Sequence, residues 1–307
     1  MAVVLVVFVW TMFTDSAEDA DRPPERPSSS TVPEPTGPRV LDPGAEPRQV
    51  LRLVLTEGEQ VSFQVVTDLD VTQTSGDDEL QVDTPAVIQT ITMTVEQVHA
   101  RGAEADISFE ITAASVYPED RFPQQTIDEL NLGLGALVGI GGSGRISQTG
   151  EVVSFDYRYD GADPAVAESL DQMAGQLEHL TPSFPTEPLG VGARWVEETE
   201  AQLSGVTFSQ ATTYELTDIT DGAVEYTSTI EQTADPQDLD LAEADESRLV
   251  SYSGSGSGSG LFTLSTLVAA GSTSMVAEQV IVVTSPGGAE MELTQNLTLE
   301  LVIDVIW

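Results

Sequence analysis

The sequence predicts a mainly β protein in which one large, curved antiparallel sheet forms a half-barrel and carries two amphipathic helices on its concave face. Apolar residues alternate with polar ones from Val50 to the end of the chain, which is the period of half-buried strands. Turn-forming pairs such as Asp221-Gly222 separate these stretches at spacings that suit hairpins. A sheet of about a dozen strands must curl, split or close, so a closed barrel and a two-sheet sandwich are the alternatives.

The first segment, residues 1–20, has the composition of a signal peptide or a membrane anchor. Its residues Ala2 to Phe13 are apolar except for Thr11, and this run is shorter than the ~20 apolar residues of a full membrane span. Acidic residues from Asp15 onward favour export of the chain that follows. We therefore expect an extracytoplasmic protein that contacts the membrane through this segment or is secreted.

The second segment, residues 21–48, holds eight prolines together with acidic side chains. Such a composition predicts a disordered, acidic linker, because it offers too little apolar surface for a packed element. The remaining residues, 49–307, are expected to fold as a single antiparallel β domain. A domain of this length buries a sizeable core without disulfides.

Strands are predicted along the whole domain. Period-two alternation is strongest at 61–71, 107–113 and 297–305. Further stretches rich in Val and Thr are predicted strands at 87–98, 145–148, 152–159, 195–203, 208–219, 224–232, 261–267, 276–283 and 291–295. Short turns rather than long crossovers connect them, so the sheet should be antiparallel.

Two segments have the helical period instead, near 124–138 and near 163–180. In the first, an apolar stripe follows Thr126 as an N-terminal cap and consists of Ile127, Leu130, Leu134 and Leu137. In the second, Asp163-Pro164 begins the helix and the stripe consists of Val166, Leu170, Met173, Leu177 and Leu180. Each stripe must be buried against the sheet.

Charge and cysteine content exclude several functions. The chain has 51 acidic and 11 basic residues, for a net charge of -40, and every basic residue is Arg. Such a surface repels phosphate polymers, so we expect no nucleic-acid partner. Without cysteine there are no disulfides, thiolate nucleophiles or iron–sulfur clusters.

Two glycine-rich stretches resemble phosphate-binding loops but fail the test of context. Gly139, Gly141 and Gly144 form a GxGxxG, yet a helix precedes and a strand follows, which is the reverse of a dinucleotide site. These glycines instead predict a bent or bulged strand against a close neighbour. The run from Gly254 to Gly260, alternating with serine, lacks the lysine of a phosphate loop and predicts a flexible loop or a kinked edge strand.

Catalytic and metal-binding patterns are weak, and we expect neither an enzyme nor a cofactor. His99 and His179 are the two side chains that could act as bases at neutral pH, and neither lies beside a GxSxG nucleophile. Acidic residues are too numerous to identify a catalytic pair; a buried pair facing a cleft would favour an enzyme. The acidic loop from Asp235 to Glu246 does not have the EF-hand spacing, so we predict a solvated loop rather than a calcium site.

A resemblance to a known family rests on PLGVGARW (Pro188 to Trp195), the DPAVAESLDQMAGQLEHL before it, and QATTYEL, EQTADPQDLDL and LTQNLTLEL after it. Over about Leu41 to Leu301 the chain resembles uncharacterised cell-envelope proteins of high-GC Gram-positive bacteria. Many members look like lipoproteins or secreted proteins with a proline-rich tether, although this chain lacks their acylated cysteine and basic leader. The resemblance implies an envelope location and no catalytic residues. The pattern is also similar to half-barrel lipoproteins that carry lipids, which implies a fold alone.

The expected function is binding of an apolar small molecule or lipid in a half-barrel cavity. The candidate lining residues are the apolar side chains of the two helices: Ile127, Leu130, Leu134, Leu170, Met173 and Leu177. The alternative is a surface interaction or structural domain with a solid interior and no ligand. The sequence identifies no protein partner.

Overall fold

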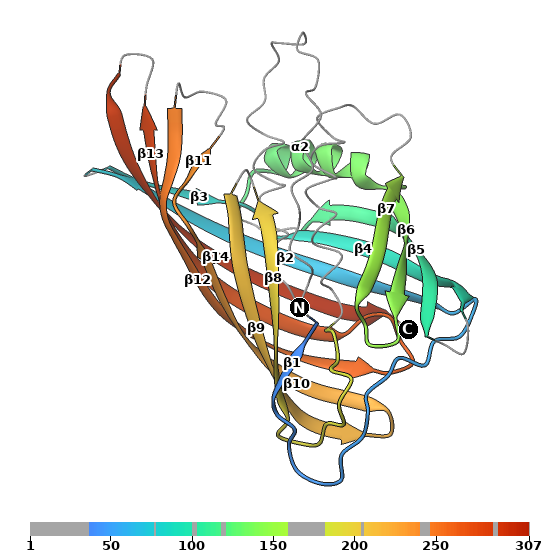
Figure 1. Cartoon of the computed structure of the whole chain (residues 1–307). Helices are drawn as coiled ribbons and strands as arrows, with labels where there is room; N and C mark the ends of the chain where they lie inside the picture. Colours follow the sequence, from blue (N-terminus) through green and yellow to red (C-terminus); the bar gives the residue numbers. More distant parts are fainter. Residues whose placement is uncertain are drawn as a thin grey trace.

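The computed structural model of the chain describes residues 37–76, 78–99, 103–117, 121–158, 182–203, 206–239, 246–284 and 288–306. The predicted signal or anchor segment, most of the linker and the helix predicted near 163–180 lie outside these residues. Figure 1 shows one large curved sheet that wraps partway around an interior, with a helix lying across one end.

The strands are long and follow one another closely along the chain. The first seven are β1 (Arg39–Asp42), β2 (Gln60–Ser75), β3 (Asp78–Asp83), β4 (Val87–Val98), β5 (Glu104–Val116), β6 (Gly141–Ser147) and β7 (Val152–Arg158). The others are β8 (Arg194–Leu203), β9 (Val206–Thr220), β10 (Ala223–Ala234), β11 (Gln237–Leu239), β12 (Glu246–Thr263), β13 (Ala270–Thr284) and β14 (Glu290–Ile306). Between β5 and β6 lie helix α2 (Gln124–Leu134) and the 3-10 turn η2 (Gly135–Leu137).

All these strands belong to one antiparallel sheet. Its order is β1-β8-β9-β10-β12-β13-β14-β2-β4-β5-β6-β7, with β3 paired to β2 and β11 paired to β12 off this path. The path starts at β1 and ends at β7, so the sheet is curved but not closed into a barrel. Near the middle of the sheet, the last strand of the chain pairs with β2 from Ile306↔Ser62 to Thr294↔Thr74. The predicted mainly β fold with a large curved antiparallel sheet is confirmed.

The start of the domain was predicted too late. Strand β1 pairs with β8 through Val40↔Trp195, so the fold begins before Gln49 and includes the end of the predicted linker. Prolines are tolerated there because β1 is an edge strand and Pro38 and Pro43 lie outside it. The following residues are bound to the 189–191 segment by backbone hydrogen bonds, including a reciprocal pair between Gln49 and Leu189 at 2.8 Å.

The PLGVGARW stretch builds this contact. A Cβ on Gly190 would collide with the backbone oxygen of Ala45 and lie 3.2 Å from that of Pro47, so only glycine lets the two segments approach. Trp195 is 0% exposed, stacks on Tyr214 with ring centroids 5.2 Å apart, and donates its indole N–H to the Ser183 carbonyl at 3.1 Å. The motif is therefore structural.

The Gly/Ser run was also predicted wrongly. Gly254 to Gly260 lie in the middle of β12, paired with β10 on one side and β13 on the other, and form neither a loop nor an edge. The serines are exposed whereas the glycines face inward and are half-buried. Glycine usually weakens a strand. Here large side chains of the neighbouring strands occupy the space that a Cβ would need.

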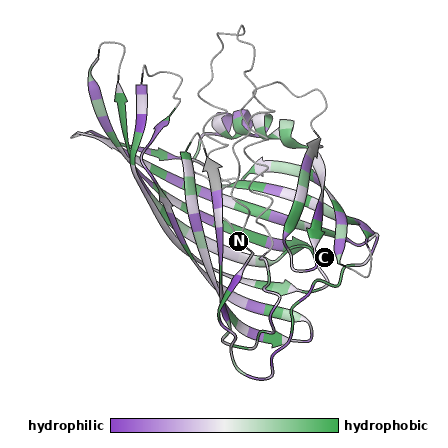
Figure 2. Cartoon of the chain, viewed as in Figure 1, coloured by the Kyte–Doolittle hydropathy of each residue, from purple (hydrophilic) through white to green (hydrophobic). Residues whose placement is uncertain are grey.

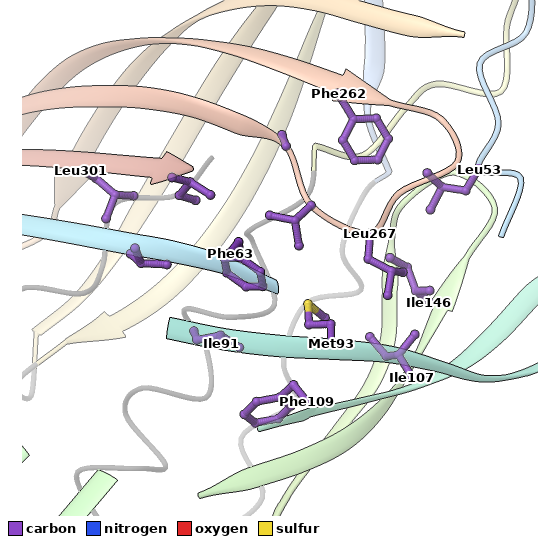
Figure 3. Close-up of a cluster of buried hydrophobic side chains, with 14 of the residues drawn as sticks. Leu53, Phe63, Ile91, Met93, Ile107, Phe109, Ile146, Phe262, Leu267 and Leu301 are labelled. Atoms are coloured by element: carbon purple, nitrogen blue, oxygen red, sulfur yellow. The ribbon is translucent and has the colours of Figure 1, made fainter. Parts of the chain in front are cut away.

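The main core lies on the concave side of the sheet. Figure 3 shows side chains of β2, β4, β5, β6 and β12 and of the loop after β12 pointing toward one another, among them Phe63, Met93, Phe109 and Phe262. Helix α2 confirms the helix predicted near 124–138, but it begins after Pro123, so Thr126 lies inside the helix and is not its N-terminal cap. Its Ile127, Leu130 and Leu134 are buried in this core. Within the described part of the chain, no helix is both long enough and apolar enough to cross a membrane.

Candidate functional site

The two faces of the sheet differ in charge. Along each strand, hydrophilic and hydrophobic residues alternate (Figure 2). The central part of the sheet consists of eight strands: β8, β9, β10, β12, β13, β14, β2 and β4. Their register and burial place one charged side chain, Glu197, on the inward face. The outward face of the same strands carries many acids, such as Asp70, Glu231 and Glu300. The concave face is therefore the surface on which an uncharged molecule would be accommodated.

The concave face is not purely apolar, because a group of hydroxyls crosses it. We call Tyr226, Ser228 and Thr273 the hydroxyl cluster. Ser228 and Thr273 flank Gly258 in the sheet, whereas Thr67 lies two strands farther along the same row, beyond Leu301, and is not part of the cluster. Tyr226 and Thr273 are each 3% exposed and Thr67 is 6% exposed.

Two hydroxyls of the cluster, and that of Thr67 farther along the row, lack a protein partner. Within the described residues, Thr67 Oγ1, Tyr226 OH and Thr273 Oγ1 are buried without a hydrogen bond. A buried polar group left unpaired costs about 1–3 kcal/mol, so each such group in a native protein requires an explanation. The cluster is the strongest indication on the concave face that a polar group from outside the chain binds there.

The glycines of β12 make room for the cluster. A Cβ on Gly258 would lie 2.8 Å from both Ser228 Oγ and Thr273 Oγ1. A Cβ on Gly260 would lie 2.5 Å from the hydroxyl oxygen of Tyr226. Both distances are far below van der Waals contact, so the polar side chains lie against bare backbone.

A second polar group on the concave face is fully paired. Gln232 donates to Gln210 Oε1 at 2.7 Å and accepts from the Tyr252 hydroxyl at 2.6 Å, while Gln210 donates to Thr212 Oγ1 at 3.2 Å. Burial raises the pKa of Tyr252 to about 12, so its hydroxyl remains a donor at neutral pH. The side chains of this network hydrogen-bond to one another, so they do not need a partner from outside the chain.

An apolar row separates the hydroxyl cluster from this amide network. It consists of Leu69, Ile230, Met275 and Leu299, which pack together across the sheet. Gly256 lies between Ile230 and Met275 in the register. The concave face thus offers alternating apolar and uncharged polar rows.

Glu197 is the exception to the neutral interior. It faces inward on β8 and is half-buried, and this desolvation raises the pKa of its carboxyl, opposed in part by a hydrogen bond with Ser183. The pKa of Tyr214 is also raised, first by its own burial and then by the neighbouring Glu197 charge. Ionised Glu197 is therefore less favourable in the folded state than in the unfolded chain.

Replacing Glu197 with glutamine should therefore stabilise the protein at neutral pH. A raised carboxyl pKa means that the folded state loses stability relative to the unfolded state as pH rises from the ordinary value of 4.5 through the folded value. Urea denaturation at pH 4 and pH 7 should show a stability gain in E197Q at pH 7 that shrinks at pH 4. Exposed Glu198, 3.8 Å from Arg39, provides the control E198Q, for which we expect a change of about 0–1 kcal/mol. A larger loss of stability in E197Q at pH 7 than at pH 4 would contradict this assignment.

The predicted lining residues fall in two groups. Ile127, Leu130 and Leu134 lie under α2 and are buried in the main core. Leu170, Met173 and Leu177 lie outside the described residues. A ligand-lining role for these six therefore stays a prediction.

The motifs tested for chemistry have structural places. Gly142, inside the GxGxxG stretch, lies in β6 against the Phe109 ring, which a Cβ would meet, so the predicted close neighbour is confirmed. His99 contacts Asp106 at 2.7 Å on the outward face, and Arg145 Nε donates to the other oxygen of Asp106 at 2.8 Å. The hydrogen bond from Arg145, then that from His99, lowers the pKa of Asp106. His99 thus joins an ion-pair group at the β4–β5–β6 end of the sheet.

Two further candidates lie partly or wholly outside the described chain. His179 is outside it, as are residues 240–245 of the acidic loop. Among the residues that the structure does describe, no three His, Asp or Glu side chains gather as a metal site would require.

Comparisons with known proteins identify no family. No protein-family model matches the chain, and no curated protein matches it. Among solved structures, OmpF of Salmonella typhi in complex with daunomycin has a TM-score of 0.26 at 10% identity, over 81% of this chain and 98% of that one. OccK8 (OprE) of Pseudomonas aeruginosa has a TM-score of 0.20 at 6% identity, over 82% of this chain and 100% of that one. OpdL of Pseudomonas aeruginosa has a TM-score of 0.19 at 6% identity, over 81% of this chain and 99% of that one. TM-scores this low assign neither a fold family nor a function.

Proposed function

We propose that this protein is a non-enzymatic, extracytoplasmic binding module that holds an apolar or amphiphilic molecule against the concave face of its half-barrel. The observation that carries the proposal is the difference between the faces: eight central strands place one charged side chain inward and many outward. Apolar ligands bind to concave, mostly apolar surfaces with a few placed polar groups, and the concave face has this composition.

An envelope location is part of the proposal. It is supported by the apolar run from Ala2 to Phe13, the acidic residues after it and the proline-rich stretch that precedes β1. A domain held by such a tether would meet its ligand outside the cytoplasmic membrane.

A ligand-free interaction domain is the second candidate. It is favoured by the tight packing of one end of the concave side, where Trp195, Phe184 and Phe262 are fully buried against one another. In that case the unpaired hydroxyls would be hydrated and the sheet would serve as a scaffold.

Substitutions at two adjacent residues, Ala277 and Val276, distinguish between the two candidate functions. Ala277 faces inward, half-buried between Gly254 and Leu297 in the register, whereas its neighbour Val276 faces outward and is 53% exposed. Tryptophan at Ala277 adds a large ring to the concave face, and tryptophan at Val276 adds it to the outer face.

The test is a titration of the full chain with the uncharged apolar dye N-phenylnaphthylamine, followed by its fluorescence and by displacement with dodecanol. We expect saturable binding that is weakened at least about tenfold, or about 1.4 kcal/mol, in A277W and unchanged in V276W. Absence of saturable binding, or equal weakening in both variants, would favour the ligand-free domain. Thermal melts of both variants confirm that they remain folded.

A further inference from the structure

We propose that the hydroxyl cluster, Tyr226, Ser228 and Thr273, binds the uncharged polar group of an amphiphile through an ester, ether or hydroxyl oxygen. The inference rests on the proposed function and specifies the class of ligand. Its basis is the coincidence, in one part of the concave face, of unpaired donors, adjacent apolar surface and a lack of cationic side chains.

The donors are the first step of the argument. Tyr226 OH and Thr273 Oγ1 are buried and have no partner within the described residues. Each carries an O–H that needs an acceptor. Burial raises the pKa of Tyr226, so its phenol stays protonated at any physiological pH. An oxygen that accepts hydrogen bonds from such donors matches the cluster.

The glycines of β12 fix where the donors lie. Gly260 lets the Tyr226 ring rest against the strand, and Gly258 lets Ser228 Oγ and Thr273 Oγ1 approach from opposite sides. These positions are set by the backbone of a central strand rather than by a loop. Donors held in this way lose little entropy on binding, which favours a defined site over a general polar surface.

Apolar side chains that are 0–8% exposed adjoin the cluster directly. Ile230 lies two residues from Ser228 on β10, and Met275 lies two residues from Thr273 on β13. Leu299 on β14 and Leu69 on β2 continue the same apolar row. A hydrocarbon chain packed against these side chains would have its polar end within reach of the hydroxyls. The arrangement fits a molecule that is polar at one end and apolar along its length.

Charge selects against ionic ligands. The inward positions of the eight central strands hold no Arg, and Glu197 is the one carboxyl among them. An anionic group would be desolvated without a counter-ion, and burying an unpaired charge is far more costly than burying a hydrogen-bonded neutral group. The preferred ligand is therefore neutral.

The test compares three probes that share a twelve-carbon chain: dodecanoyl glycerol, dodecyl phosphate and dodecyltrimethylammonium. The full-length protein is titrated calorimetrically with each probe below its micelle concentration. We expect dodecanoyl glycerol to bind at least about tenfold more tightly than either charged probe, which is the factor expected for leaving polar or charged groups imperfectly paired.

Two conservative variants, Y226F and T273V, remove single unpaired hydroxyls with little change of shape. Each should weaken dodecanoyl glycerol binding about three- to tenfold and leave N-phenylnaphthylamine binding unchanged, because one hydrogen bond is lost. The same variants should keep or raise the melting temperature of the ligand-free protein, since no internal bond is broken. T229V, on the outward face of β10, is the control and should alter neither affinity.

The outcomes separate this inference from the proposed function. If all three probes bind equally and the two variants change nothing, the hydroxyls are hydrated by water only and the inference is wrong, while apolar binding still stands. If neither the dye nor any probe binds, both the inference and the proposed function are overturned.

Discussion

Replacing Trp195 with alanine is expected to lower the free energy of unfolding by about 3–5 kcal/mol, the range for truncating a buried Trp. The side chain is 0% exposed and stacks on Tyr214, and its indole donates to the Ser183 carbonyl. Its loss removes aromatic contacts, opens a cavity and leaves a buried carbonyl without its donor. Urea denaturation followed by far-ultraviolet circular dichroism measures the change.

The matched control for W195A is Y117A. Tyr117 is 52% exposed, so truncating it should change the free energy of unfolding by no more than about 0.5 kcal/mol. Comparable losses in W195A and Y117A would mean that the packing around Trp195 does not hold β8 and β9 together as described.

Replacing Gly256 with alanine should destabilise the protein by about 1–3 kcal/mol, as overpacking does. An added Cβ would collide with the Met275 side chain and lie 2.7 Å from the backbone oxygen of Ser274. The sign is informative, because in an ordinary strand alanine is better than glycine by about 0.5–1 kcal/mol. Chemical denaturation of the ligand-free protein is the measurement.

Two neighbours provide controls for G256A. Ser257 faces outward, so S257A should change stability by less than about 0.5 kcal/mol. The nearest atoms to an added Cβ on Gly254 belong to side chains, the first being Gln232 Oε1 at 2.9 Å. The loss of stability in G254A should therefore be smaller than that in G256A. A stabilised G256A would show that β12 does not need glycine for packing.

Much of the fold could be predicted because the period of two persists wherever a strand has one buried face. The predicted strand at 87–98 is β4 itself, and the helix near 124–138 is α2 followed by η2. In both, the local pattern and the tertiary burial agree, so propensity and packing favour the same structure.

The errors arose where tertiary contacts override local propensity. Glycine and serine in β12 have low strand propensity, yet Tyr226 and Met275 from the neighbouring strands occupy the space above the glycines. The proline-rich composition around β1 indicated a linker, but the segment is bound to residues 189–191 by backbone hydrogen bonds that no composition reveals. Strict Gly/Ser alternation was itself the missed signal, since it has the period of a strand.

The candidate site was harder to predict than the fold. Tyr226 and Thr273 are far apart in sequence and come near each other only through the strand order β10-β12-β13. The apolar stripes in the sequence favour the helices as the lining, and Ile127, Leu130 and Leu134 of α2 are buried in the core. Which threonines lack partners depends on strand register, and register is fixed by long-range pairing.

The most direct test of the concave-face proposal is native mass spectrometry of the full-length protein, exported from a related host and purified without detergent, with an organic extract of the same sample. We predict one added mass in defined stoichiometry, recovered in the extract as an uncharged amphiphile, present in V276W and lost or strongly reduced in A277W. A bare protein mass with nothing extractable, or an adduct that A277W retains in full, would contradict the proposal that the concave face is a binding site.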